Sequence, residues 1–467
     1  RSSDLQEKIM SESPLKQRLP KTMDTDTNLG TKVDPWPWLE PDDVRRNMTD
    51  KEIIYKFVDL TESDLTDKQK RLVYNTILRY KKAFSLRDEI GTCPFMEVAL
   101  EVNDKTPFYI RPFPCNEEDK KVVDKQMRKG CLLGIMKEGM SSYSSPIMLI
   151  PRKLGGIPRI VTDFRLLNTR LVRLNPSIPL VKDAMQLLGA SEVEVISVID
   201  LRDAYHTLRL DKDSQKFCGI TPYYGSPTYI YLRLAMGLSV SPAIWQTFIT
   251  KVLSKIEHRK HYLAIMDDLL IHSNKTTHLT HLINLFKALI LNGLKISPKK
   301  CQLYRKQLVY MGHTILVKDH GACITPLTNN VDPILKLEPP KTAKLAKSLC
   351  GMVNFLAMYL PKLQDLLRPI YKLTRKGVKF EWTEECQANF ETIKKLLTKP
   401  PVLSMPKPEG RYVMVSDTSK FACGATLYQW QKGDYRLVGY LSKSLPEPAQ
   451  RYTISEDRKS TRLNSSH

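Results

Sequence analysis

The feature that most constrains this chain is a pair of adjacent aspartates, Asp267 and Asp268, inside the apolar run Tyr262–Ile271. Four apolar residues directly precede the pair and three follow it, a pattern that predicts a strand, a tight turn and a second strand. Burying two like charges costs free energy unless a cation lies between the two carboxylates and a third group that also binds it. A divalent metal ion would serve as that cation. The alternative is a plain Asp-Asp turn between two core strands.

Length and composition bound the class of protein. A chain of 467 residues is expected to form about two to four domains, and its 42% of hydrophobic residues is enough for packed cores. The sequence contains no run of about 18 apolar residues, so no membrane span is predicted. The nine cysteines form no CxxC pair, which argues against zinc fingers and disulfide scaffolds and favours a reducing compartment. The chain begins with Arg1 and has no signal-like start, so we interpret it as a fragment or an internal product.

The charge balance points to a polyanionic partner. Lys and Arg number 72 against 50 acidic residues, a surplus of 22. Residues 1–50 contain 8 basic and 10 acidic residues, so the rest of the chain carries 64 against 40 and holds the whole excess. A surplus of this size favours nucleic acid, bound with salt-sensitive affinity. Many basic proteins bind nothing of the kind, so the charge gives a direction only.

The first part of the chain contains no residues to which we assign a chemical role. Residues 1–50 are polar and aperiodic, which is typical of a disordered segment or a linker. Within them the aromatic stretch 34–39 either docks on a folded neighbour or belongs to a sticky linker. Apolar spacing predicts a helix within residues 66–84.

A basic hairpin is predicted further along. Pro146–Pro151 has the pattern of a buried strand, residues 152–156 form a basic tip, and residues 157–165 form the returning strand. Cations at such a tip suit a triphosphate or a nucleic-acid backbone, although a solvated charged face is the commoner explanation of such a loop.

A third carboxylate ends another predicted strand. Glu194–Leu201 is a β-type run in which Asp200 comes near the end, and Tyr205 follows five residues later. A second hairpin is predicted over residues 222–234, and helices are predicted through Trp245 and from Leu279 to a stop at Asn292.

Three carboxylates on rigid elements fit the chemistry of nucleotide addition. That reaction must activate a 3′-hydroxyl and stabilise a leaving pyrophosphate, and two Mg²⁺ ions roughly 3.5–4 Å apart can do both. Side chains alternate along a strand, so a regular strand aims only one acid of the pair at Asp200. We expect Asp267 to be the shared metal ligand and Asp268 the more peripheral one.

Several motifs, taken together and in order, resemble the Pol polyproteins of gypsy-like LTR retrotransposons over roughly residues 90–456, the span that the motifs mark out. The matching stretches are Pro151–Asn168, Ile199–His206, Leu234–Leu238, Ser241–Ala243, Tyr262–Ile271, Gly293–Cys301, Tyr310–His313, Phe380–Thr383, Pro400–Leu403, Met414–Ser419, Gly424–Leu427 and Tyr452–Glu456. The resemblance implies an α+β right-hand polymerase with fingers, palm and thumb, followed by a connection and a truncated RNase H-like α/β domain.

The resemblance also implies domain limits and residue roles. The limits are 1–90 for a linker or pre-polymerase region, 91–317 for fingers and palm, 318–407 for thumb and connection, 408–456 for the truncated RNase H-like domain, and 457–467 for a non-native tail. The implied catalytic residues are Asp200, Asp267, Asp268 and Lys300, of which the three aspartates bind metal. The implied dNTP-binding residues are Lys153, Arg159, Tyr205, Met236 and Gly237. The implied primer grip is Tyr310, Met311, Gly312 and His313, and the implied RNase H ligands are Asp417 and Glu456.

Some of these roles have a physical basis in the residue types. Tyr205 would lie under the sugar and exclude a ribose 2′-hydroxyl, the group that separates the two kinds of nucleotide. Gly237 allows close approach of the backbone. The lysine of the Gly293–Cys301 motif is thought to protonate pyrophosphate, and we favour Lys300 over Lys299.

The sequence departs from the family pattern in two places. Ile265 stands where the family usually has an aromatic residue, which bears on fidelity or rate more than on metal binding. After Glu456 the pattern breaks abruptly into a segment that resembles translated vector sequence, so we expect no RNase H cleavage by this chain alone. No Asp-Thr-Gly protease triplet and no His/Cys integrase cluster occurs.

The leading hypothesis is an RNA-directed DNA polymerase, a nucleotidyltransferase that uses two Mg²⁺ ions, with Mn²⁺ as a substitute. Its expected partners are an RNA or DNA template with primer, an RNA–DNA hybrid and dNTPs, with no membrane; the expected location is the cytoplasm, in virus-like particles or the cytosol, or else the nucleus. One alternative is a catalytically decayed or domesticated nucleic-acid-binding protein. Another is an RNA-dependent RNA polymerase, which also has a palm with paired acids.

Overall fold

The fold is given by a computed structural model that describes residues 36–41, 43–151, 157–175, 178–318 and 321–446. The chain divides between Pro37 and Trp38 into two units, and all elements below belong to the second. Lys153, Glu456 and the expected tail at 457–467 lie outside the described residues.

A four-stranded antiparallel sheet forms the centre of the fold, in the order β11-β12-β7-β13. Its strands are β7 (Val195–Asp200), β11 (Tyr262–Ile265), β12 (Asp268–Ser273) and β13 (Gln302–Arg305). The strand, turn and strand predicted for Tyr262–Ile271 are confirmed, and the strand that carries Asp200 is confirmed as well.

Both faces of this central sheet are buried, because successive side chains along a strand point to opposite faces and almost all of them are buried here. Ile199 and its strand partner Leu269 belong to one apolar core, which includes residues of α8 (Ser241–Ser254) and α9 (His278–Leu291). Val198 and its partner Leu270 belong to a second core. The sheet therefore has little freedom to slip in register, because a shift by one residue would exchange the two apolar faces.

The predicted basic hairpin is confirmed as β5 (Ile147–Ile150) paired antiparallel with β6 (Arg159–Thr162). Short strands surround it in three further small sheets, β1-β8, β2-β4 and β3-β10-β9. Their bounds are β1 (Glu97–Val98), β2 (Phe108–Tyr109), β3 (Met136–Glu138), β4 (Tyr143–Ser144), β8 (Arg209–Leu210), β9 (Gly219–Ile220) and β10 (Tyr229–Tyr231). The helices of this region are α4 (Glu117–Leu132), α5 (Arg165–Arg170), α7 (Lys212–Gln215), η3 (Ala204–Thr207) and η4 (Lys216–Cys218).

The sequence predicts that residues 1–50 are disordered or a linker. That prediction is wrong for the described residues from Trp38 to Asp50, which belong to the second unit. Trp38 donates its indole N–H to the carbonyl of Arg87 at 2.7 Å, and Leu39 is buried. Docking of the aromatic stretch on a folded neighbour is therefore the correct alternative for Trp38. The elements that follow are η1 (Val44–Arg46), α2 (Asp50–Phe57), α3 (Asp67–Arg79) and η2 (Lys81–Ala83), and α3 confirms the predicted helix.

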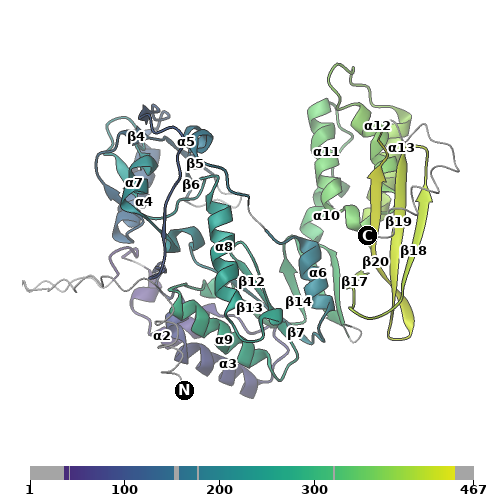
Figure 1. The fold of residues 1–467 in the computed structure, drawn as a ribbon, viewed down its shortest axis with the longest axis horizontal. Coiled ribbons are helices and arrows are strands. Elements are labelled where there is room, and N and C mark those ends of the chain that lie inside the picture. The colour runs from purple at the N-terminus through teal and green to yellow at the C-terminus, as the bar shows by residue number, and fades with distance from the viewer. Residues whose placement is uncertain (1–35, 42, 152–156, 176–177, 319–320, 447–467) are drawn as a thin grey trace, which may run out of the picture. The chain divides into compact units, whose positions relative to one another are not determined.

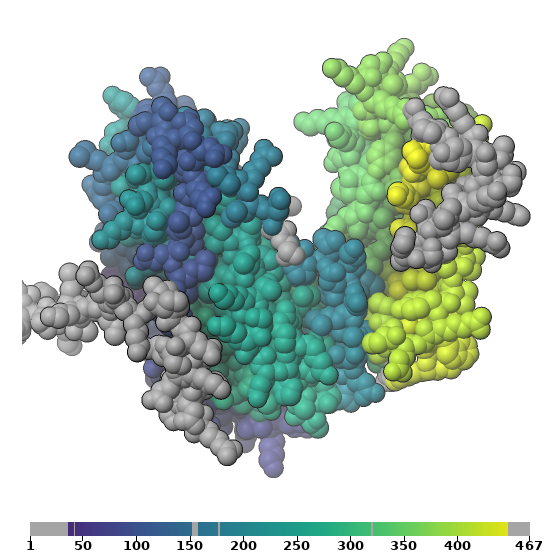
Figure 2. All heavy atoms as spheres, viewed as in Figure 1, coloured from purple at the N-terminus to yellow at the C-terminus, as the bar shows by residue number. Residues whose placement is uncertain are grey.

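A second antiparallel sheet, β14-β15-β16-β17, follows the central sheet along the chain. Its strands are β14 (Gln307–Tyr310), β15 (His313–Lys318), β16 (Gly321–Pro326) and β17 (Leu403–Ser404). Figure 1 shows α6 (Val181–Gly189) beside this sheet, where it contacts β16, and Figure 2 shows the blue residues of α6 at the surface on this face. The pairing of β15 with β16 spans the domain limit expected at 317/318. The helices here are α10 (Thr328–Leu335), α11 (Ala343–Phe355), η7 (Ala357–Tyr359), α12 (Leu363–Lys372) and α13 (Glu384–Thr398).

The last described elements form a three-stranded antiparallel sheet, β18-β19-β20 (Figure 1). Its strands are β18 (Tyr412–Thr418), β19 (Ala422–Gln431) and β20 (Asp434–Ser444). Helix α12 contacts both β19 and β20. None of the helices in the described ranges has the length and apolar character that crossing a membrane requires.

Candidate active site

The three predicted acids come together at one end of the central sheet. Strand pairing places Asp268, the first residue of β12, opposite Asp200, the last residue of β7. The next residue of the chain, Leu201, donates its backbone N–H to the carbonyl of Asp267 at 3.0 Å. Both members of the pair therefore border Asp200, and the register gives Asp268 the backbone position directly across from it.

The charges of the two adjacent acids affect different tyrosines. Burial, together with the charge of Asp267, raises the pKa of Tyr205 to about 12. Burial, together with the charge of Asp268, raises the pKa of Tyr310. Asp267 is thus close enough to Tyr205, the expected sugar-contacting residue, to affect its pKa, and Asp268 is close enough to affect that of Tyr310 in the expected primer grip.

Negative charge at this site is incompletely neutralised. Burial raises the pKa of Asp267 to about 6, and the nearby charges of Asp200 and Asp268 add to the rise. Burial and the charge of Asp200 also raise the pKa of Asp268. The Oδ1 atom of Asp267 is buried and has no hydrogen-bond partner within the described part of the chain. An acceptor in this state is a site that a cation would stabilise.

One lysine reaches the acids. Lys300, at the end of η6 (Pro298–Lys300), donates from its Nζ atom to Oδ2 of Asp200 at 3.0 Å. Its side chain is 65% exposed, so the ion pair is accessible to solvent and can open at little cost. Lys299 lies elsewhere, with its Nζ 4.4 Å from the ring centroid of Phe57.

The residues present fit a site for Mg²⁺. In the ranges that the structure describes, no three carboxylate, imidazole or thiol side chains are close enough together to ligate a single ion. Mg²⁺ commonly takes only one or two protein carboxylates and completes its shell with water and substrate phosphates. Asp267, with its unpartnered Oδ1, and the neighbouring Asp200 would meet that requirement, because the remaining ligands would come from water and the nucleotide.

The turn that carries the paired acids is held by helix α8. Met266, which precedes Asp267, has a φ of +56°, a conformation that is uncommon for a non-glycine residue. The indole N–H of Trp245 donates to the carbonyl of Met266 at 2.9 Å. Gln246 accepts from the N–H of Met266 at 2.9 Å and donates to the carbonyl of Ala264 at 2.9 Å. The sequence analysis missed these two residues, although a glutamine within an apolar helix was a signal.

The residues expected around the nucleotide differ in their exposure to solvent. Tyr205 is half-buried, with its ring edge-on to Trp245 at a centroid distance of 6.3 Å. Arg159, at the start of β6, is exposed, and Met236 is 48% exposed. Lys153 is outside the described residues.

Asn168, which the sequence analysis named only as the end of the Pro151–Asn168 motif, fixes the loop at Gly237. Gly237 has a φ of +95°, and a Cβ there would lie 3.2 Å from the carbonyl oxygen of Thr162. The side chain of Asn168 donates to the carbonyl of Gly237 at 2.9 Å and accepts from the N–H of Ser239 at 2.7 Å. The fingers hairpin and this loop are therefore joined through backbone and side-chain contacts.

The expected primer grip is the turn between β14 and β15. Tyr310 and His313 are register partners on either side of Met311 and Gly312, which have φ values of +51° and +78°. Asn330 donates to the carbonyl of Gly312 at 2.8 Å.

The far side of this turn rests on α11 and η7. The ring of His313 stacks on Phe355 at a centroid distance of 5.1 Å, and its Nδ1 lies 2.9 Å from the hydroxyl of Tyr359. The turn is therefore fixed by helices that come later in the chain.

The expected RNase H ligand Asp417 lies on β18 and is 66% exposed. Lys362, at the start of α12, donates to its Oδ2 at 2.6 Å and lowers its pKa. Glu456, the other expected ligand, is outside the described residues, so the structure does not bring the two together.

A buried antiparallel sheet that presents three acids at one end is the arrangement expected of a polymerase palm. Residues 151–315 match the family model described as reverse transcriptase (RNA-dependent DNA polymerase). Residues 382–459 match the model described as an RNase H-like domain found in reverse transcriptase. The second match begins within the expected connection, just before α13.

Known proteins agree with these matches. The chain is 29% identical over 350 residues to the Tf2-7 and Tf2-3 transposon polyproteins of Schizosaccharomyces pombe (strain 972), matching 74% of this chain. It spans about a quarter of the length of these relatives, 25% in each case.

Solved structures share the fold. Foamy viral protease-reverse transcriptase in complex with dsDNA has a TM-score of 0.77 and 20% identity, covering 90% of this chain and 85% of that one. The same protein in complex with an RNA/DNA hybrid has a TM-score of 0.74 and 20% identity, covering 90% and 55%. The predicted right-hand polymerase fold with an RNase H-like domain is confirmed.

Residues 151–315 therefore form a reverse transcriptase domain and residues 382–459 an RNase H-like domain of the kind found in reverse transcriptase, the two parts expected of a gypsy-like LTR retrotransposon Pol polyprotein.

Proposed function

We propose that this chain is an RNA-directed DNA polymerase that adds deoxynucleotides to a primer 3′-hydroxyl on an RNA or DNA template. The observation that carries the proposal is the convergence of Asp200, Asp267 and Asp268, with Oδ1 of Asp267 buried and unpartnered in the described chain. The substrates are dNTPs and the product is extended DNA, held as an RNA–DNA hybrid or a DNA duplex. Action in the cytoplasm, in virus-like particles or the cytosol, is part of the proposal.

Asp200 and Asp267 would hold two Mg²⁺ ions, with Asp268 assisting; such ions supply charge neutralisation for the attacking 3′-oxygen and the leaving pyrophosphate. Trp245 and Gln246 keep the Asp267 turn in place while the ligands exchange. Positioning of this kind matters because a ligand displaced by about 1 Å can cost about a hundredfold in rate.

Lys300 is proposed to donate a proton to the leaving pyrophosphate. In the structure its ammonium is bonded to Asp200. When positive ions neutralise Asp200, this ion pair loses its partner, and the exposed lysine becomes free to turn toward the phosphates. The same group thus serves as a counter-ion before substrate binds and as a general acid afterwards.

Tyr205 is proposed to select deoxynucleotides. Its ring is held edge-on by Trp245 and lies on the side of Asp267, where the sugar of an incoming nucleotide would be bound. A ring fixed in this way would collide with a 2′-hydroxyl. Replacement by valine, a smaller side chain, is expected to increase rNTP incorporation while dNTP incorporation persists.

Primer extension tests the proposed function. Purified protein is given Mg²⁺ and a primed RNA or DNA template, first with dNTPs and then with rNTPs. Extension with dNTPs on RNA supports the proposal. Preferential use of rNTPs would identify an RNA-dependent RNA polymerase instead, and salt-sensitive template binding without any extension would identify a nucleic-acid-binding protein.

For the RNase H-like domain we propose that this chain alone cleaves no RNA. Asp417, its expected first metal ligand, is exposed and neutralised by Lys362 rather than gathered with other acids of the described sheet. Degradation of the RNA strand of a hybrid by the purified protein, abolished by Asp417→Asn, would contradict this proposal.

A further inference from the structure

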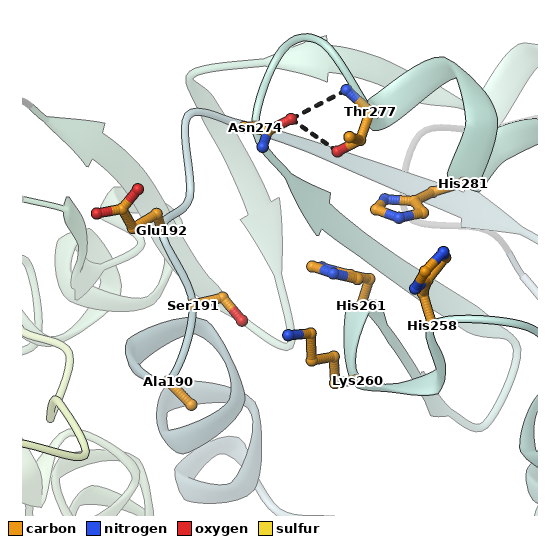
Figure 3. A pocket seen from close by; sticks show the side chains of 9 residues that line it. All are labelled: Ala190, Ser191, Glu192, His258, Lys260, His261, Asn274, Thr277 and His281. Carbon is orange, nitrogen blue, oxygen red and sulfur yellow. Dashed lines mark hydrogen bonds between the residues drawn. The ribbon is translucent and has the colours of Figure 1, made fainter.

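A second polar pocket lies at the opposite end of the β11–β12 hairpin from the paired acids (Figure 3). Its cavity volume is about 380 Å³, and three segments line it: residues 190–192 after α6, residues 258–261 around η5 (Arg259–His261), and residues 274–281 at the start of α9. Because η5 leads directly into β11, the pocket and the acids share the same hairpin but not the same end. The proposed polymerase reaction makes no use of this pocket.

Three imidazole rings gather on one wall of the pocket. Figure 3 shows His258, His261 and His281 side by side, and the ring centroids of His261 and His281 are 4.2 Å apart and stacked. His258 lies 5.5 Å from His281 and 6.4 Å from His261. His272, on β12, lies behind them at 5.3 Å from His261. Packing of this density is costly once several of the rings carry a proton.

Several nitrogens of the pocket have no partner in the described chain, although the Nδ1 of His261 is hydrogen-bonded to the backbone carbonyl of His272 at 2.9 Å. Lys260 has no carboxylate partner, and the rings of His258 and His281 have no hydrogen bond, within the described parts of the chain. His281 is only 3% exposed, and its Nδ1 is buried and unpartnered. Glu192 is the acid among the lining residues, and in Figure 3 its carboxylate points away from the imidazoles.

The remaining charged groups nearby are already engaged or turned away. Arg259 donates to the backbone carbonyl of Tyr262, and Lys275 forms an ion pair with Asp64 at 2.6 Å. Glu194 accepts from the backbone N–H of Lys275 at 2.8 Å. The charge of Glu257 acts on Tyr262. Inside the pocket, therefore, the ammonium of Lys260 and the ring nitrogens face no anion of the protein.

Burial and mutual repulsion lower the pKa values of His261 and His281. Burial lowers the pKa of His281 to about 4, and the neighbouring His261 and His258 lower it further. The pKa of His261 is lowered by burial as well. His272 and His278, behind the pocket wall, have pKa values lowered to about 3 in the same way. A bound anion would reverse this effect, since an opposite charge favours the protonated ring.

We propose that this pocket binds a phosphate group through Lys260, His258 and the stacked pair His261 and His281. A phosphate presents several acceptor oxygens and matches a wall made of donors. The hydroxyl of Thr277, at the start of α9, is on the opposite rim, although it already donates to Asn274 at 2.7 Å. The phosphate is either a free one or part of a nucleic-acid backbone, and the chain's surplus of 22 positive charges suits both. Binding takes up protons, so affinity increases as the pH falls.

Histidine proton NMR of the full chain in EDTA tests the site, because imidazole C2–H signals report protonation directly. One arm titrates inorganic phosphate, and the other a single-stranded oligonucleotide. Each is measured near the ordinary histidine pKa of about 6.5 and again about two units higher. The expected result is a saturable shift of several histidine signals, with weaker binding at the higher pH. A response to phosphate alone assigns a free-phosphate site, and a response only to the oligonucleotide assigns a backbone contact.

The variant that tests the assignment combines Lys260→Ala with His258→Asn. Both side chains are exposed, and asparagine tolerates the φ of +58° at position 258, so the fold is expected to persist. Affinity should fall by about tenfold or more, equivalent to losing one charge-assisted contact. Lys255→Ala, an exposed lysine at the end of α8, is the matched control and should bind normally. Absence of any shift in both arms, or an equal loss of affinity in the control, would overturn the proposal.

Discussion

The side-chain amide of Gln246 holds Met266, the residue before the paired acids, by accepting from its backbone N–H at 2.9 Å. The same amide donates to Ala264 at 2.9 Å, so one side chain spans the end of β11. Gln246 is 2% exposed, which means that water cannot replace either bond. A left-handed residue next to a metal ligand is therefore maintained by a helix, and the geometry of the site depends on α8 as much as on the strands.

Gln246→Leu should reduce both stability and turnover. The change leaves the N–H of Met266 and the carbonyl of Ala264 buried without partners, and each such group costs about 1–3 kcal/mol. Gln246→Glu keeps the acceptor for Met266 and should retain more activity than the leucine variant. Denaturant unfolding combined with steady-state primer extension checks this. Equal activity in the two variants would show that the bond to Met266 does not position the acids.

The pH dependence of stability should reveal Asp267 when metal is absent. Its pKa is 3.8 in an unfolded chain and about 6 in the folded protein. Because the folded form binds the proton more tightly, this group contributes stability that is fully present below 3.8 and is lost as the pH rises through about 6. The comparison is between the wild-type chain and Asp267→Asn, unfolded in EDTA at a series of pH values. The asparagine variant should lack this component, and parallel curves for the two proteins would contradict it.

Gly237→Ala should impair primer extension more than Gly225→Ala, although both substitutions place alanine at a similar positive φ. Gly225 is the control, since its φ is +87° against +95° for Gly237 but nothing lies within 4 Å of a Cβ there. Alanine costs roughly 1–2 kcal/mol in either left-handed position. Only at Gly237 would the methyl press on the carbonyl of Thr162 and move the loop that Asn168 holds. KM for the nucleotide and kcat, measured in both variants, decide the point, and similar losses would indicate strain alone.

Lys300→Ala should slow extension by about a hundredfold or more, the range typical of a lost general acid. Lys299→Ala should have little effect, because its ammonium lies over the ring of Phe57. The pH–rate profile separates the roles: loss of a proton donor should remove the alkaline limb of the profile, whereas loss of a counter-ion to Asp200 should shift the acidic limb. Equal effects of the two lysine variants would contradict the assignment.

The sequence predicted the local elements of the site well, for a physical reason. Strands with buried faces are specified by residues that are near in sequence, so the hairpin at Asp267 and the strand that ends at Asp200 follow from apolar patterns. The register that pairs Asp268 with Asp200 does not follow from apolar patterns, because it depends on how two strands that are distant in sequence pair with each other.

Contacts between distant segments could not be predicted from the pattern. Gln246 and Asn168 lie on helices that are distant in sequence from the segments they hold. The residues of the turn at Met266 and of the loop at Gly237 do not indicate which side chains will bond to these segments. The N-terminal segment shows the same limit. Its polar composition indicates disorder, yet Trp38 docks through a single hydrogen bond to Arg87 that no local periodicity encodes.

The most direct test of the central claim is primer extension on poly(rA) with an oligo(dT) primer, dTTP and Mg²⁺. Wild-type chain is compared with Asp267→Asn and with Asp213→Asn, an exposed acid of α7 that serves as the control. The account predicts extension by the wild type and the control, and loss of at least about a thousandfold in Asp267→Asn, since a metal ligand carries several kcal/mol of transition-state stabilisation. Extension that survives in Asp267→Asn would contradict it.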